Sequence, residues 1–222
     1  MVHTKPLVEH VVGVVIAGGR SVRFGGEKAA AVLTGKPLLM WAAARLQRSC
    51  QSVAINTRSG TEAEVIASRA GLTVLYDAEA DPRGPLAGVS AGLMWAEERG
   101  AKLLAVSPCD VPMLPLDLFP RLIEAAGLGA AMAQTDDGLQ PLCAVWPVSA
   151  LAAVRDALTQ GRHPATWMML EKLGARRVYF QQAAAFANIN TRADLTDLAS
   201  RLEQAGARPM ADRRQRFLRR LK

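Results

Sequence analysis

The sequence predicts an α/β protein built as a three-layer sandwich around a mainly parallel sheet. Short apolar runs rich in valine and isoleucine, typical of strands buried on both faces, alternate with longer segments of helical character. Glycine, asparagine or aspartate follows several of these runs directly, as expected where parallel strands end at a ligand-binding edge. The chain has 222 residues, half of them hydrophobic, which is enough to bury a core without disulfides or metals.

The first half of the chain supplies four strands in alternation with helices. The strands are expected at 11–16 (VVGVVI), 52–56 (SVAIN), 72–76 (LTVLY) and 101–107 (AKLLAVS). A helix opened by Pro37 is expected to run to about Cys50, and a second one, over 61–71, is stopped by Gly71. A third helix follows the turn-rich DPRGP segment and ends near Glu98, before Gly100.

The second half begins with a helix expected over 117–126. AAMAQ (130–134) and LCAVWP (142–147) are expected to be two further strands, joined by a turn at Asp136-Asp137-Gly138. Helices over 148–159 and 164–173, a short strand at 176–180 and a helix over 191–205 complete the pattern. Because no repeat or low-complexity linker interrupts this pattern, residues 1–207 are expected to form a single domain.

Residues 208–222 are expected to form a separate basic tail. The chain carries 27 basic and 20 acidic residues, a net charge of +7, but seven of the basic residues and only one acidic residue lie in this tail. The rest of the chain, with 20 basic and 19 acidic residues, is therefore almost neutral. A solvated tail is the favoured interpretation, and nucleic acid is not expected as a partner; an electrostatic handle for a partner or an anionic surface is the alternative.

Several protein classes are excluded by the sequence. No apolar run approaches the length of a membrane span, and the N-terminus does not resemble a signal peptide, so we expect a cytoplasmic protein with no membrane partner. The cysteines and histidines are few and scattered, which argues against a disulfide framework and against a His/Cys metal cluster. These residues are Cys50, Cys109, Cys143, His3, His10 and His163.

The loop after the first expected strand has the composition of a phosphate-binding site. In AGGRSVRFGGEK, glycines such as Gly18 and Gly19 allow backbone amides to approach a ligand, and Arg23 and Lys28 add positive charge. The loop is not a Walker A motif, because glutamate precedes the lysine and alanine follows it. A polyphosphate is the expected ligand, and a turn with solvated basic side chains is the alternative.

Three further strand ends carry polar residues that we expect at the same edge of the sheet. Asn56 and Asp77 end the second and third strands and suit contacts to a base and a ribose, although either residue would also serve a turn. Asp110 follows the fourth strand between two prolines. A carboxylate in this position suits Mg²⁺ bound through few protein ligands and substrate phosphates. The alternative for Asp110 is a helix cap or a turn.

Four segments, in order, resemble the bacterial molybdenum cofactor guanylyltransferases. IAGGRSVRFGGEK is similar to the signature LAGGxSxRMGxDK of nucleotidyltransferases, and DPRGPLAGVSAGL, SPCDVPMLP and FANINTRADL are similar to later segments of the same family. The resemblance covers residues 11 to about 199. It implies a Rossmann-like sandwich of the nucleotidyltransferase type. Phe24, Glu27 and Arg192 depart from the family pattern, and Arg192 is expected to matter only to the start of the last helix.

The resemblance also implies roles for individual residues. Lys28 and Asp110 would be catalytic, and Asp110 would hold Mg²⁺, the implied cofactor. Asn188 and Asn190 match paired asparagines near the family's C-terminus and, with Arg23, are candidates for contacts to phosphate or cofactor. Asn190 would alternatively cap the helix of residues 191–205. The implied nucleotide-binding residues are Ile16, Ala17, Gly18, Gly19, Lys28, Asn56, Asp77 and Asp110.

The function implied is the transfer of GMP from GTP to the terminal phosphate of a molybdopterin-type molybdenum cofactor, with release of pyrophosphate. Cofactor-inserting proteins or molybdoenzymes are further candidate partners. Three other functions stay open: a cytidylyltransferase for the same cofactor, a sugar-phosphate nucleotidyltransferase, and a non-catalytic nucleotide-binding protein. The basic tail alone would support a role in binding nucleic acid.

Overall fold

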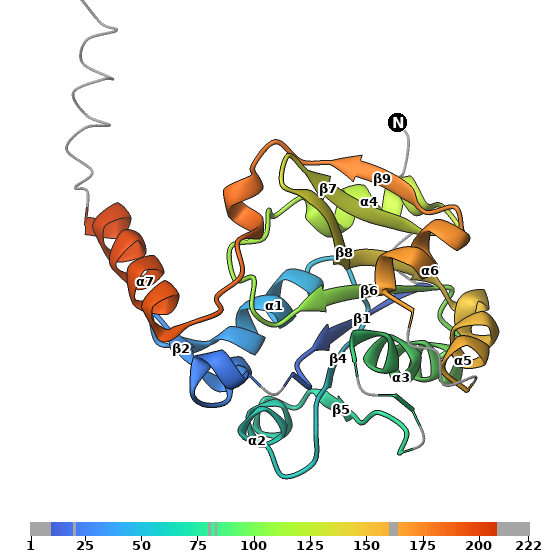
Figure 1. The fold of residues 1–222 in the computed structure, drawn as a ribbon, viewed down its shortest axis with the longest axis horizontal. Coiled ribbons are helices and arrows are strands. Elements are labelled where there is room, and N and C mark those ends of the chain that lie inside the picture. Colours follow the sequence, from blue (N-terminus) through green and yellow to red (C-terminus); the bar gives the residue numbers. More distant parts are fainter. Residues whose placement is uncertain (1–9, 20, 80, 83, 160–163, 208–222) are drawn as a thin grey trace, which may run out of the picture.

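The central feature of the computed structural model is a seven-stranded sheet with the order β5-β4-β1-β6-β8-β7-β9 (Figure 1). The structure describes residues 10–19, 21–79, 81–82, 84–159 and 164–207, so the predicted basic tail at 208–222 lies outside the described residues. The strands are β1 (Val11–Ile16), β4 (Val53–Asn56), β5 (Thr73–Leu75), β6 (Leu103–Pro108), β7 (Ala131–Thr135), β8 (Gly138–Pro147) and β9 (Arg176–Tyr179). Among the strands that the structure describes, β8 alone runs antiparallel to its neighbours, which confirms a mainly parallel sheet.

Helices cover both faces of the sheet, as the alternation of apolar segments predicts. They are α1 (Leu38–Leu46), α2 (Glu62–Arg69), α3 (Pro85–Glu98), α4 (Leu118–Ala126), α5 (Leu151–Thr159), α6 (Thr166–Lys172) and α7 (Arg192–Ala207). The side chains of β1 point alternately into two cores, one on each face of the sheet. Val11 and Val15 pack with α1, α2 and α4, whereas Val12 and Val14 pack with α3, α5 and α6. Figure 1 shows α3, α5 and α6 gathered on one side. The three-layer sandwich is therefore confirmed.

A small hairpin between β1 and α1 was not predicted from the sequence. Val32–Leu33 (β2) pairs with Lys36–Pro37 (β3), and the turn between them places Thr34 and Gly35 at positive φ. Pro37 ends this hairpin and precedes the first residue of α1, so the predicted helix start is correct within one residue. Strands of two residues are too short to produce a periodic pattern, which is why the hairpin left no signal in the sequence.

The last helix packs against this hairpin through a third, smaller core. Phe24, Leu33, Leu38 and Ile189 are buried together, and apolar side chains of α7 pack against them. α7 thus lies beside β2 at one end of the molecule (Figure 1). Among the described residues, no helix combines the length and the hydropathy that crossing a membrane would require.

Candidate active site

The carboxyl ends of four neighbouring strands meet at one edge of the sheet. In the parallel register, Ile16 at the end of β1 lies opposite Asn56 of β4 and Pro108 of β6, and Asn56 lies opposite Leu75 of β5. The residues that follow these strands therefore face the same space. Ala17 is held there by its backbone amide, which donates to the carbonyl of Asn56 over 2.8 Å.

Lys28 and Asp110 form an ion pair at this edge. The Lys28 ammonium lies 2.6 Å from Oδ2 of Asp110, and both side chains are largely shielded from solvent, with 15% and 17% of their surface exposed. The predicted convergence of the loop lysine and the strand-end aspartate is thus confirmed, while their roles in catalysis stay predictions. The alternative in which Asp110 caps the following helix is wrong, because Asp117 is the N-cap residue of α4.

The segment before α7 brings Asn190 to the same ion pair. The backbone amide of Ile189 donates to the carbonyl of Asp110 over 2.8 Å, and the Lys28 ammonium lies 3.4 Å from Oδ1 of Asn190. Asn190 does not cap α7. Thr191 and Asp194 cap it instead, because the side chain of each accepts a hydrogen bond from the backbone amide of the other, as in a capping box. Asn190 is therefore free to face Lys28, whereas the side chain of Asn188 is exposed.

The glycine-rich loop is held on one side by α7. Phe24 is buried, and the Arg192 guanidinium lies 5.3 Å from the centre of its ring, a cation–π contact. A Cβ at Gly26 would lie 3.2 Å from the Arg192 guanidinium, so Arg192 also covers the end of the loop. The expectation that Arg192 matters only to the helix start is therefore wrong. Arg23 and Gly19 are exposed, and Gly18 is half-buried.

Asn56 and Asp77 form the other half of the site. The Asn56 amide donates to Oδ1 of Asp77 over 2.9 Å, and Asn56 itself is almost fully buried. Burial raises the pKa of the Asp77 carboxyl, the hydrogen bond from Asn56 opposes this shift, and the nearby charge of Asp81 adds to it. A carboxylate held by one amide keeps other lone pairs available to accept from a ribose hydroxyl or a base.

Gly88 of α3 packs closely against the site. The sequence analysis did not predict that this position requires glycine for packing. A Cβ at position 88 would lie 2.3 Å from Oδ1 and 3.0 Å from Cγ of Asn56, so the buried amide occupies space that any larger residue would need. The GPLAG segment therefore serves at least in part to let α3 approach β4. The signal available in the sequence was a glycine inside a helix, where it is otherwise unfavourable.

We expect Gly88→Ala to weaken nucleotide binding by roughly two- to tenfold, because the net value of a displaced hydrogen bond is about 0.5–1.5 kcal/mol. Titration with GTP and Mg²⁺ measures the effect. The matched control is Gly92→Ala, one turn further along α3, where the new Cβ meets Leu104 and Val14 in the core. The control should lower the melting temperature without a selective loss of affinity, and equal affinity losses in both variants would contradict the assignment.

The donor set suits a metal held mainly by its substrate. Among the residues that the structure describes, no group of three or more His, Cys, Asp or Glu side chains could hold a metal ion. Asp110 offers one carboxylate, with the amide oxygen of Asn190 close to the same ammonium group. Magnesium is commonly bound in this way, through one or two carboxylates and substrate phosphates, so the residues present fit the expected ion.

Comparison with known proteins first defines the class. The family model of the MobA-like NTP transferase domain matches residues 13–178, so the protein is a nucleotidyltransferase. A relative named molybdenum cofactor guanylyltransferase from Cereibacter sphaeroides is 37% identical over 193 residues, covering 86% of this chain and 97% of the relative. One of the same name from Ralstonia nicotianae is 39% identical over 205 residues, with the same coverage. The chain therefore belongs to the molybdenum cofactor guanylyltransferases of the MobA-like family.

A solved structure agrees with this assignment. The crystal structure of molybdopterin-guanine dinucleotide biosynthesis protein A from Archaeoglobus fulgidus superposes with a TM-score of 0.67 at 25% identity, covering 87% of this chain and 99% of that one. The family resemblance expected from four sequence motifs, and the nucleotidyltransferase type of sandwich, are both confirmed.

Proposed function

We propose that the protein transfers GMP from GTP to the terminal phosphate of a molybdopterin-type molybdenum cofactor. The observation that carries this proposal is the 2.6 Å contact between Lys28 and Asp110 at the carboxyl edge of the sheet, in a chain of this family. An oxygen of the acceptor phosphate attacks the α-phosphorus of GTP, and the bond between that phosphorus and the oxygen bridging to the β-phosphate breaks. The products are the guanine dinucleotide cofactor and pyrophosphate.

In this reaction the protein has to align the reacting phosphates and compensate their charge, but it does not have to transfer a proton. The attacking phosphate oxygen is already ionised at neutral pH, so no general base is needed. The leaving pyrophosphate carries the charge that develops in the transition state, and preorganised positive groups stabilise it. Gly19 is exposed and Gly18 is half-buried, so their backbone amides would serve this purpose, and the Lys28 ammonium would add a compact positive charge.

Asp110 and Asn190 would hold Mg²⁺ together with the phosphates of GTP. When bound, the ion neutralises phosphate charge and orients the reacting groups. In the structure the Asp110 carboxylate is paired with the Lys28 ammonium, so a bound Mg²⁺ and Lys28 would share one anionic partner. We infer that Lys28 contacts the β- and γ-phosphates from the same side of the site, because its amine already lies beside that carboxylate.

The Asn56–Asp77 pair would bind the nucleoside. Asn56 presents a carbonyl oxygen packed against Gly88, and its amide fixes the Asp77 carboxylate in one orientation. The relatives' name supports guanine as the base, and the acceptor named for the Archaeoglobus fulgidus protein supports a molybdopterin. Because Asn56 is almost fully buried and Asp77 is half-buried, hydrogen bonds to a ribose or base would discriminate against ligands that leave these groups unpaired.

A nucleotide panel tests the proposal. The protein is incubated with Mg²⁺, metal-loaded pterin cofactor and GTP, CTP, ATP or UTP in turn, and the dinucleotide formed is identified by mass. We expect the guanine dinucleotide and stoichiometric pyrophosphate from GTP alone. A cytosine dinucleotide would favour a cytidylyltransferase, transfer to sugar phosphates would favour a sugar-phosphate enzyme, and binding of GTP without turnover would indicate a non-catalytic protein; each contradicts the proposal.

A further inference from the structure

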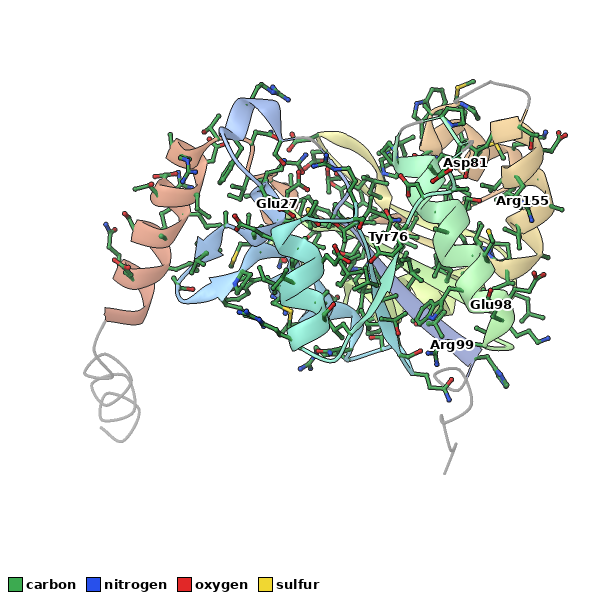
Figure 2. The ribbon with its side chains drawn as sticks, turned by 90° about the horizontal axis from the view of Figure 1, so that it is seen from below. Glu27, Tyr76, Asp81, Glu98, Arg99 and Arg155 are labelled. Carbon is green, nitrogen blue, oxygen red and sulfur yellow. The ribbon has the colours of Figure 1, made fainter. Side chains whose placement is uncertain are left out.

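Glu27, the residue immediately before Lys28, connects the glycine-rich loop to α2. Its Oε2 accepts a hydrogen bond from the backbone amide of Glu62 over 2.7 Å, and its Oε1 accepts one from the amide of Ala63 over 2.8 Å. Figure 2 shows Glu27 at one end of α2. Both carboxylate oxygens are therefore used, by two amides that lie 35 and 36 positions further along the chain.

These two amides are ones that a helix leaves without partners. The first backbone amides of an α-helix have no carbonyl to bond within the helix. In α2 the side chain of Thr61 accepts from the amide of Glu64 over 3.3 Å, and Glu27 takes the two amides before it. A carboxylate at this end also interacts favourably with the helix dipole. Glu27 thus completes the cap of α2 from a distant segment.

Hydrogen bonds and packing on either side of Lys28 restrict the position of its backbone. The backbone amide of Lys28 donates to the hydroxyl of Ser21 over 3.3 Å, which fixes the loop on the side before Lys28. Ala29, the residue after Lys28, is buried in the same core as Ala63. With Glu27 bound to the helix end, the backbone that carries Lys28 is held on both sides, and its ammonium reaches Asp110 from a fixed origin.

We propose that Glu27 is a positioning residue, which ties the loop to α2 and thereby holds the Lys28 ammonium at Asp110. The inference rests on the proposed function, because it gives Lys28 its task. The physical reason is that a misplacement of about 1 Å at a reacting group reduces rates by up to roughly 10²-fold. Glutamine at this position keeps the volume but offers one acceptor oxygen and no charge, so one of the two amides loses its partner.

The first test compares Glu27→Gln with Glu64→Gln. Glu64 also lies in the first turn of α2, but its carboxylate accepts from the Gly60 amide and the Tyr76 hydroxyl. We expect Glu27→Gln to lower kcat about tenfold with little change in the KM for the pterin acceptor, since only the alignment of Lys28 is disturbed. Glu64→Gln should keep its kcat, even if both variants melt at a lower temperature.

The second test breaks the hydrogen bond between Glu27 and Glu62 by changing its donor, the backbone amide of Glu62. Glu62→Pro deletes the amide that donates to Glu27, and proline is well tolerated at the first helical position after an extended residue such as Thr61. Glu62→Ala keeps the amide and serves as the matched control. We expect Glu62→Pro to lower kcat several-fold and Glu62→Ala to leave it unchanged; equal rates for the two variants would overturn the proposal.

A double-mutant cycle with Lys28→Met separates positioning from general destabilisation. If Glu27 acts through Lys28, Glu27→Gln has no further effect on the single-turnover rate once the ammonium is gone. An unchanged tenfold effect in that background, or a normal kcat for Glu27→Gln itself, would overturn the inference. Failure of the unmodified protein to form any dinucleotide would instead contradict the proposed function, so the two failures are distinguishable.

Discussion

Asp110→Asn is expected to lower the rate of guanylyl transfer by about 10²–10³-fold, the range found when one charged or polar group that stabilises the transition state is removed. Asparagine has nearly the same shape, so the packing after β6 should survive. It lacks the negative charge that would bind a divalent cation, and it leaves the Lys28 ammonium, 2.6 Å away, without its anionic partner. The half-saturating Mg²⁺ concentration should therefore rise together with the loss of rate.

The measurement is pyrophosphate release at several Mg²⁺ concentrations, with the melting temperature as a check on folding. Asp117→Asn is the matched control, because Asp117 lies in the next segment of chain, is mostly exposed and pairs only weakly with Arg121, at 3.6 Å. The control should keep its rate and its Mg²⁺ dependence. A near-normal rate for Asp110→Asn would contradict the role that we propose for Asp110 in catalysis.

Lys28→Met is the second large effect, and we again expect a loss of about 10²–10³-fold, because it removes the positive charge that we propose beside the departing pyrophosphate. Its Mg²⁺ dependence should differ in sign from that of Asp110→Asn. With the ammonium gone, the Asp110 carboxylate has one competitor fewer for its charge, so the half-saturating Mg²⁺ concentration should fall. Opposite shifts in the two variants would identify the shared carboxylate.

Lys36→Met is the control for Lys28→Met. Lys36 belongs to the hairpin strand β3, eight residues further along, and its ammonium lies 5.3 Å from the centre of the Trp41 ring rather than in the site. This variant should turn over GTP at the normal rate. If both Lys28→Met and Asp110→Asn retained near-normal rates, charge compensation at this edge could not be the basis of catalysis.

The sequence predicted most elements of this fold within a few residues, because their signals are local. VVGVVI is apolar at every position but its glycine, and it is β1, buried on both faces of the sheet. Gly71 and Gly100 follow α2 and α3 and adopt positive φ, as helix-ending glycines do. Two features were not predicted from the sequence, the hairpin of β2 and β3 and the early start of β8 at Gly138. Short or irregular strand pairings depend on the partner strand and leave no local signal.

Part of the site was also predictable, since parallel strands bring their carboxyl ends to one edge. This rule places Asn56, Asp77 and Asp110 together from the sequence alone. It says nothing about which side chains touch. The contact of Asn190 with Lys28, and the cation–π contact of Arg192 with Phe24, join residues more than 150 positions apart and depend on where α7 packs.

By itself, the sequence determined the α/β class, the order of strands and helices, the glycine-rich and basic composition of the loop, and the family. These properties follow from short-range periodicity and from residue chemistry, which each segment carries alone. Only the tertiary structure decided that Glu27 caps α2, that Gly88 makes room for Asn56, and that Lys28 and Asp110 form an ion pair. The physical reason is that hydrogen bonds, charges and excluded volume act over a few ångströms, and chain folding alone brings such distant residues within that range.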